Sequence, residues 1–196
     1  KLNPTLLGDD RLREILNQRL GFDIIVPDDA FAHDLKFDAG VALIRNLQQA
    51  AEKAAVEFNL KLTNTLETEN SNHNLPENET MLYMSGRALH AISVNLAARL
   101  QQEFNGGLDI SFSAGVDFQN VLEVLACGLT PITVCSDILK PGGYGRLHQY
   151  LQTIRHGCES KGSQSIEDFI LAYAGNHRDL KAAALENLIR YAEEVV

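Results

Sequence analysis

The apolar residues of this chain recur at two spacings, and the wider spacing predicts helices. Along residues 37–58 the apolar positions, among them Val41, Ile44 and Leu47, lie three or four residues apart. That spacing places them on one face of a helix. Residues 11–20 repeat the pattern after an acidic pair, and Gly21 follows as a helix stop. Two amphipathic helices are therefore expected before residue 60.

Short apolar runs predict strands between these helices. The runs fall at residues 22–26, 60–66, 81–84, 110–113 and 131–135, and residues 1–4 of the apolar stretch 1–7 read as the inside of another strand. Further helical patterns cover residues 88–104 and 118–127. Strands that alternate with helices of this length predict an α/β fold with parallel strands.

Two segments depart from this alternation. Residues 67–80 are rich in Glu, Asn, Thr and Ser, and they predict a long exposed loop. The last fifty residues show helical patterns alone, near 146–159, 166–174 and 180–196. We therefore expect a partial (βα)8 barrel over residues 1–145, followed by a helical extension over 146–196 that leads toward a further domain.

Composition narrows the class of partner. The 196 residues carry a net charge of -9. This argues against nucleic acid and against an anionic membrane surface, because both require a basic face. No apolar run approaches the roughly 20 residues of a membrane span. The three cysteines form no CxxC pair, so we expect no zinc or iron–sulfur site in this segment and reduced thiols in a cytoplasmic protein. A first residue that is not Met suggests a piece of a longer protein.

The candidate chemistry lies where strands end, because parallel barrels place functional groups at the carboxyl ends of their strands. Ser113-Ala114-Gly115 and Cys135-Ser136 follow two successive predicted strands. Ser85-Gly86 follows the predicted strand 81–84. A glycine after a strand lets backbone N–H groups approach a phosphate, which the next helix N-terminus also favours. The alternative is that Gly115 serves only a tight turn.

Other polar residues on the strands admit two interpretations each. Lys1 and Lys61 either meet an anion or an electron-rich ring inside a barrel, or face solvent. Asn64 either hydrogen-bonds a ligand or supplies ordinary turn polarity. For Cys135 a small buried hydrophobic role is favoured over a reactive thiol.

Several runs together resemble a known group of flavoproteins. Lys1-Leu2-Asn3-Pro4, Asn64-Thr65, Met84-Ser85-Gly86 and Val134-Cys135-Ser136 resemble motifs of dihydroorotate dehydrogenase and of the flavin domain of dihydropyrimidine dehydrogenase. A closer resemblance is to the selenate reductase flavoprotein subunit family, relatives of the glutamate synthase small subunit. Its shared runs include 1–8, 61–65, 84–89, 112–116 and 140–147.

This resemblance implies both an architecture and a site. The chain would be the C-terminal part of the barrel, roughly strands four to eight, in a cytoplasmic flavin and iron–sulfur oxidoreductase subunit. Iron–sulfur and FAD/NAD(P)H domains would lie downstream. FMN or another phosphate-bearing ligand would be held by Lys1, Lys61, Asn64, Ser85, Gly86, Gly115, Cys135 and Ser136, with a lysine beside the ring. No catalytic acid or base is indicated.

A second function is open on the same residues. Ala114 and Tyr83 stand where the flavin proteins keep glycine, and each adds a Cβ where a phosphate would need room. This favours a degenerate, non-catalytic barrel that acts as a scaffold for neighbouring redox domains. An open half-barrel would also expose sheet edges, so a homo-oligomer is a further expectation.

Overall fold

A short parallel sheet lies at the centre of the molecule. The computed structural model describes residues 1–71, 75–76, 78–175 and 177–196. Strand β1 (Leu60–Leu62) pairs in parallel with β4 (Ile110–Phe112), with Leu62 opposite Phe112. Leu2 adds a parallel bridge on one side of β1, and Ile132 adds one beside β4. Four parallel segments therefore lie side by side in chain order, as successive strands of a barrel do.

The two faces of this sheet differ in polarity because successive side chains alternate. Leu62 and Phe112 are fully buried beneath the helices. Lys61 and Ser111, which are register partners, face the other way and are half-buried. The apolar alternation of 60–62 and 110–112 thus fixes which face of the sheet packs on helices.

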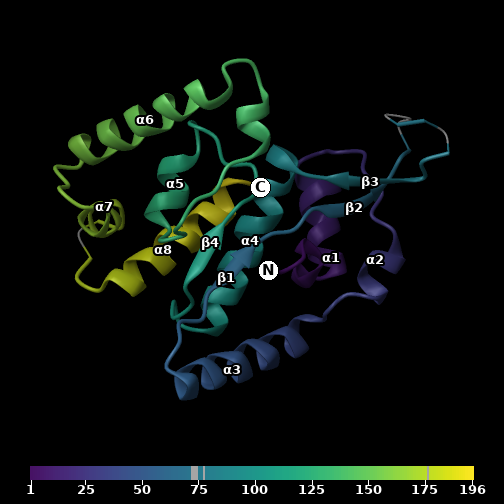
Figure 1. The fold of residues 1–196 in the computed structure, drawn as a ribbon, viewed down its shortest axis with the longest axis horizontal. Helices are drawn as coiled ribbons and strands as arrows, with labels where there is room; N and C mark the ends of the chain where they lie inside the picture. Colours follow the sequence, from purple (N-terminus) through teal and green to yellow (C-terminus); the bar gives the residue numbers. More distant parts are fainter. Residues whose placement is uncertain (72–74, 77, 176) are drawn as a thin grey trace.

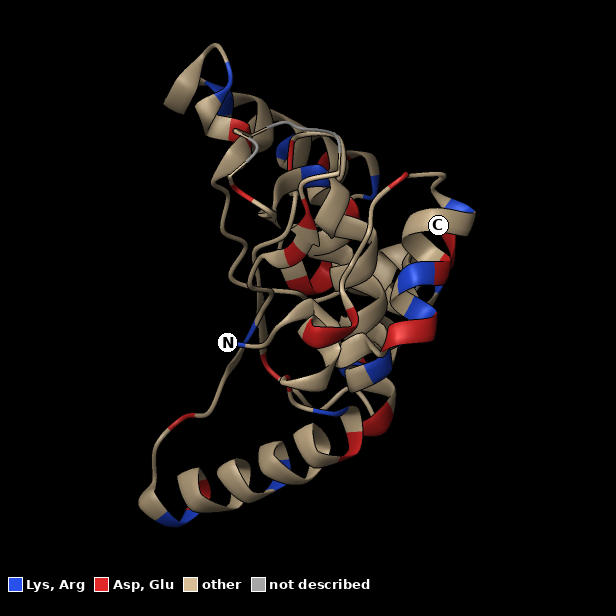
Figure 2. Ribbon diagram, turned by 90° about the vertical axis from the view of Figure 1, so that its right-hand side faces the viewer, with Lys and Arg blue, Asp and Glu red and all other residues tan. Residues whose placement is uncertain are grey.

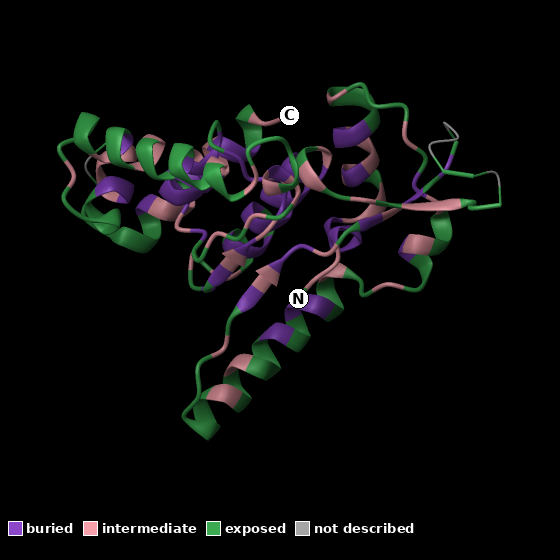
Figure 3. Ribbon diagram, turned by 45° about the horizontal axis from the view of Figure 1, so that its top comes forward, coloured by how far each residue is buried: buried purple, intermediate pink, exposed green. Residues whose placement is uncertain are grey.

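Helix α4 (His90–Glu103) forms the centre of the helical layer, as Figures 1 and 3 show. Ile92, Leu96 and Leu100 are fully buried in the main core, which includes Phe112. A 3₁₀ helix (Gly86–Leu89) precedes α4, so the predicted helix over 88–104 is confirmed with an earlier start.

The N-terminal helices cover one side of α4. The 3₁₀ helix Pro4–Leu7, α1 (Asp9–Arg13) and the π-helical segment Glu14–Arg19 place apolar side chains in the core. Helix α2 (Asp28–Ala32) follows. Helix α3 (Phe37–Ala54) lies along the bottom of Figure 1 and extends beyond the other helices in Figure 2. Only part of its predicted apolar face packs against the core: Ile44 is buried, whereas Leu47 is 43% exposed.

The predicted strand at residues 22–26 is wrong. These residues have no regular secondary structure. Side chains of the preceding helical segments occupy three of these carbonyls: Asn17 donates to those of Phe22 and Ile24, and Arg13 donates to that of Val26. The Ile25 carbonyl accepts from the Glu69 N–H. Since these hydrogen bonds replace a strand partner, β-branched residues here do not produce a strand.

The predicted loop at 67–80 is partly wrong, and so is the place of the strand after it. Strand β2 (Leu66–Glu69) pairs antiparallel with β3 (Met81–Met84), with Leu66 opposite Met84. Residues 72–74 and 77 of the predicted loop lie outside the described residues. Met81–Met84 is therefore one arm of a hairpin rather than a member of the parallel sheet.

The predicted strand at 131–135 is reduced to a single β-bridge at Ile132. Thr133 N–H donates to the Phe112 carbonyl beside that bridge. The 3₁₀ helices Ser136–Leu139 and Gly143–Arg146 follow. Because a 3₁₀ helix begins at Ser136, the extended segment that contains Ile132 ends at residue 135.

The C-terminal helices pack on the same core. Helices α5 (Val121–Ala126), α6 (Leu147–Ser160), α7 (Ile166–Tyr173) and α8 (Leu180–Glu194) agree with the predicted helical segments. Helix α8 packs against α4, α5 and α7. The buried Asn187 of α8 donates to the carbonyls of Ala126 and Ile170. Within the described residues, no helix is both long and apolar enough to span a bilayer.

Candidate functional site: a cavity at the strand ends

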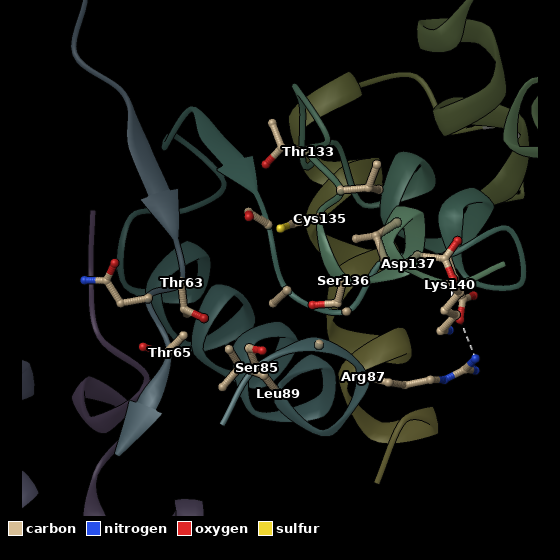
Figure 4. Close-up of a pocket in the computed structure, with 18 of the residues that line it drawn as sticks. Thr63, Thr65, Ser85, Arg87, Leu89, Thr133, Cys135, Ser136, Asp137 and Lys140 are labelled. Atoms are coloured by element: carbon tan, nitrogen blue, oxygen red, sulfur yellow. Dashed lines mark hydrogen bonds and ion pairs between the residues drawn. The ribbon is translucent and has the colours of Figure 1, made fainter. Parts of the chain in front are cut away.

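A cavity of about 360 Å³ lies at the carboxyl ends of the parallel segments. Loops after β1, β3 and β4 and the segment after Ile132 form its walls, with Cys135 and Ser136 across from Thr63 and Thr65 (Figure 4). The predicted site residues that line it are Lys1, Asn64, Ser85, Gly86, Gly115, Cys135 and Ser136. The structure thus brings seven of the eight predicted site residues to one cavity, and their role as ligand-binding residues stays a prediction.

Lys61 is the predicted site residue that lies outside this lining. Its ammonium donates to the Thr133 hydroxyl at 3.3 Å, and Thr133 does line the cavity. Lys61 lies on the polar face of the sheet with its register partner Ser111. Thr63 does line the cavity, but its buried hydroxyl hydrogen-bonds Ser93 of α4 at 2.8 Å.

Two cavity glycines are required by contacts between loops. Gly115 has φ +59, and a Cβ there would lie 2.5 Å from the carbonyl oxygen of Gly86. Gly86 has φ +72, and a Cβ there would lie 3.3 Å from the Ser136 hydroxyl. Both glycines therefore permit a left-handed backbone and a close approach. The alternative that these glycines serve tight turns is sufficient to explain them, and both also line the cavity.

The loop after β4 turns its carbonyls into the protein. The carbonyls of Ala114, Gly115 and Val116 accept hydrogen bonds from three buried side chains behind the loop. These donors are His90 Nδ1 at 2.7 Å, Asn120 Nδ2 at 3.0 Å and the Tyr150 hydroxyl at 3.0 Å. In a peptide unit the N–H points opposite to the C=O. The N–H groups of Gly115 and Val116 therefore point away from the interior, and neither donates to any described residue.

His90 joins this loop to the C-terminal helix. A carbonyl only accepts, so Nδ1 carries the proton toward Ala114, and Nε2 accepts from the Tyr191 hydroxyl at 2.7 Å. Burial lowers the pKa of His90, while the hydrogen bond to Ala114 opposes that shift. The ring is therefore the neutral tautomer that both partners require.

Two buried carboxylates belong to the cavity wall, and each is paired with at least one basic side chain. Asp137 accepts from Arg146 at 3.0 Å, Lys140 at 2.9 Å and the Tyr150 hydroxyl at 2.8 Å. Arg146 is the main cause that holds the pKa of Asp137 well below its usual range. Burial, together with Asp137, raises the pKa of Tyr150.

Asp117 is the second carboxylate, and Arg87 Nη1 donates to it at 2.5 Å. The Gln119 N–H also donates to Asp117, at 2.9 Å. Since Asp117 pairs with Arg87 and Asp137 with Lys140 and Arg146, the charge of each carboxylate is balanced by a basic side chain.

A row of amides orients Asn64. Asp34 accepts from Asn3 Nδ2 at 2.8 and 2.9 Å, and this fixes the Asn3 oxygen toward Asn64. Asn64 Nδ2 donates to that oxygen at 2.7 Å. The carbonyl oxygen of Asn64 is thereby left as an acceptor at the cavity wall.

Cys135 is exposed, so the expectation of a small buried hydrophobic residue is wrong. A single β-bridge at Ile132 holds this segment, and Cys135 lies past it on the open side. Cys127 is the buried thiol instead, and burial raises its pKa. The described residues contain no group of three or more His, Cys, Asp or Glu side chains that could hold a metal ion.

Parallel segments in barrel order, with a cavity at their carboxyl ends, define this chain as part of a (βα) barrel domain. The chain belongs to the family described as the N-terminal TIM-barrel domain of oxidoreductase YgfK, whose model matches residues 1–188. The expectations of a TIM barrel and of an oxidoreductase family are thus confirmed.

Two curated relatives support this membership. Oxidoreductase YgfK of Escherichia coli (strain K12) is 41% identical over 168 residues, which is 85% of this chain and 16% of the relative. The protein of the same name from Escherichia coli O157:H7 gives the same figures. This chain therefore spans about one sixth of the length of these relatives. No solved structure matches the chain.

Proposed function

We propose that this chain supplies one wall of an FMN site, or of a site for another phosphate-bearing ligand, in an oxidoreductase barrel. The observation that carries this proposal is the loop after β4. Three successive carbonyls bind side chains in the interior, so the N–H groups of Gly115 and Val116 are available to an anion.

The cavity has room for part of such a ligand. Ligand sites measure about 300–1,000 Å³, and about 360 Å³ lies at the low end of that range. We propose that Gly86, Gly115 and Ser136 face the phosphate, and that Lys1 and Asn64 face the ring with Cys135 between them. Bound FMN would supply hydride or electron transfer, and the residues of this chain would hold and orient it.

The sheet edges support a larger barrel. Leu2 and Ile132 are the outer members of the four parallel segments, and each has a parallel neighbour on one side only among the described residues. We propose that these are the later strands of the barrel and that the remaining strands pair at these edges. An uncovered edge is the alternative route to a homo-oligomer.

The relatives are several times as long as this chain, so the proposal extends to further domains. Because the chain spans 16% of each, we propose that iron–sulfur and FAD/NAD(P)H domains of a cytoplasmic, selenate reductase-like flavoprotein subunit act with this barrel. Electrons would then pass between those domains and the cavity.

The second candidate is a scaffold that holds neighbouring redox domains and binds no cofactor. Ala114 favours it, since its side chain is 3% exposed and fills space in the loop where the flavin proteins have glycine. On this reading the inward carbonyls serve only to fasten the loop to His90, Asn120 and Tyr150.

Titration of the full-length protein with FMN, followed by absorbance and by quenching of flavin fluorescence, separates the two candidates. Cys135→Glu places a carboxylate on an exposed cavity residue and should weaken FMN binding at least tenfold. Ser160→Glu, at the exposed end of α6, is the matched control and should bind normally. A full-length protein that binds no FMN and no other phosphate-bearing ligand would support the scaffold.

A further inference from the structure

Two basic side chains lie together at one end of the cavity. Figure 4 shows Arg87, from the helix after β3, beside Lys140, from the turn after Ser136–Leu139. Their side chains are 59% and 53% exposed. Loops far apart in the sequence thus bring two cations to the same rim.

Both cations have hydrogen-bond donors to spare. Arg87 uses Nη1 for Asp117 at 2.5 Å and for Gln119 at 2.7 Å. Its Nη2 and Nε have no partner among residues 1–71, 75–76, 78–175 and 177–196. The Lys140 ammonium makes one hydrogen bond, to Asp137, and carries three donors. Each side chain is therefore held by a buried carboxylate and keeps N–H donors that a ligand can use.

The anchors of these cations are buried carboxylates. Asp117 is 6% exposed and Asp137 is 3% exposed. Asp137 also binds Arg146, whose guanidinium already balances its charge, so the charge of Lys140 is left over. Preorganised cations lose little side-chain freedom when they meet an anion.

The charge at the cavity is the reverse of the charge of the whole chain. Lys1, Arg87 and Lys140 line the cavity against the two paired carboxylates. The chain as a whole carries a net charge of -9. A local excess of positive charge on an acidic protein points to an anionic ligand.

The backbone of the loop after β4 offers few hydrogen-bond donors to an anionic ligand. Ala114 is buried with its carbonyl bound to His90, and Gly115 is in contact with the Gly86–Arg87 backbone. The donors that this loop can present to an anion are therefore the N–H groups of Gly115 and Val116. Side-chain cations are the other means of binding a phosphate strongly.

We propose that Arg87 and Lys140 form a cation clamp that binds the terminal phosphate and makes this cavity select dianionic phosphomonoesters over neutral analogues. The clamp rests on the proposed function and deepens it. Phosphomonoesters lose their second proton near a pKa of about 6. Affinity therefore rises between about pH 5 and 7 as the ligand becomes dianionic.

The test compares FMN with riboflavin, which has the same ring and no phosphate, on the full-length protein. The expected result is tighter binding of FMN. Arg87→Gln and Lys140→Gln should each weaken FMN binding about tenfold, and the double variant should bind FMN and riboflavin alike. Because both residues are more than half exposed, these variants should fold, and circular dichroism with the melting temperature checks this.

Arg155→Gln and Lys161→Gln, at exposed positions of α6 and its C-terminal end, are the matched controls and should keep the preference for FMN. A double clamp variant that still prefers FMN overturns the clamp and leaves the proposed function standing. A native protein that binds neither flavin nor any other phosphate-bearing ligand overturns both. If the preference is the same at pH 5 and pH 7, the selection for a dianion is wrong.

Discussion

The Cα of Gly115 lies so close to Gly86 that a Cβ on Gly115 would be 2.5 Å from the Gly86 carbonyl oxygen. The loops after β3 and β4 therefore touch backbone to backbone, and their contact forms part of the cavity wall. The helix that begins at Gly86 is positioned by this contact as much as by its own core residues.

Gly115→Ala should lower the free energy of unfolding by about 3 kcal/mol. The left-handed backbone costs alanine about 1–2 kcal/mol, and displacing the Gly86 backbone adds to that. Gly162→Ala is the matched control, with φ +65 and no atom within 4 Å of the added Cβ, and it should cost only the first part. Urea unfolding measures both. Equal losses for the two variants would show that the loops separate freely.

His90→Gln should flatten the dependence of stability on pH. Burial lowers the pKa of folded His90 below its ordinary value of 6.5, so the unfolded chain takes up a proton first. The stabilisation is therefore complete above about pH 6.5 and is lost as pH falls through the lowered folded pKa. The melting temperature of the native protein should drop from pH 8 to pH 5.5 more than that of His90→Gln.

His148→Gln, in the exposed part of α6, is the control for this titration and should keep the native slope. Identical slopes for the native protein and His90→Gln would mean that the Ala114–His90–Tyr191 hydrogen bonds survive protonation.

Asp137→Asn should destabilise the fold by about 2 kcal/mol at pH 7, because buried donors of Arg146 and Tyr150 lose a charged acceptor. The pKa of Asp137 is lowered in the folded state, chiefly by Arg146. Its stabilisation is present above the unfolded pKa, near 3.8, and is lost as pH falls through the folded pKa. Native and variant curves should therefore converge in strong acid. Parallel curves down to pH 2 would contradict this account.

Asp34→Ala should cost about 1–2 kcal/mol, because Asn3 and Thr5 lose their common acceptor. It should also release the amide of Asn64 to rotate, since Asn3 no longer holds a fixed oxygen toward it. Asp29→Ala, an exposed acidic residue of α2, should change neither property. Nitrogen-15 spectra of the side-chain amides, with urea unfolding, measure both effects.

The helices were predictable because their signals are local. The three- and four-residue spacing along 37–54 and the apolar run of 90–103 need no knowledge of distant partners. The cavity residues were found by one general rule, that function lies at the ends of parallel strands. That rule located Gly86, Gly115 and Ser136 although only short stretches of true strand precede them.

The parts that were missed depend on distant contacts. The 22–26 segment satisfies the local criteria for a strand, but side chains of Asn17 and Arg13 occupy its carbonyls. Strand β2 was missed because Glu67 and Glu69 make its sequence polar, and the strand forms by pairing with β3 across the hairpin. The Arg87–Asp117 pair joins residues 30 positions apart, and no spacing in the sequence signals it.

The β2–β3 hairpin leaves the cavity wall just after Thr65 and returns to it just before Ser85. Its two ends are thus fixed by the barrel, and Leu66, Thr68 and Asn70 of its first arm are buried, whereas Tyr83 of the second arm is 70% exposed. The exposed positions of this arm can change without disturbing the parallel segments that form the cavity. Differences among members of this family should therefore concentrate between residues 66 and 84 far more than in the loops that carry Gly86, Gly115 and Ser136.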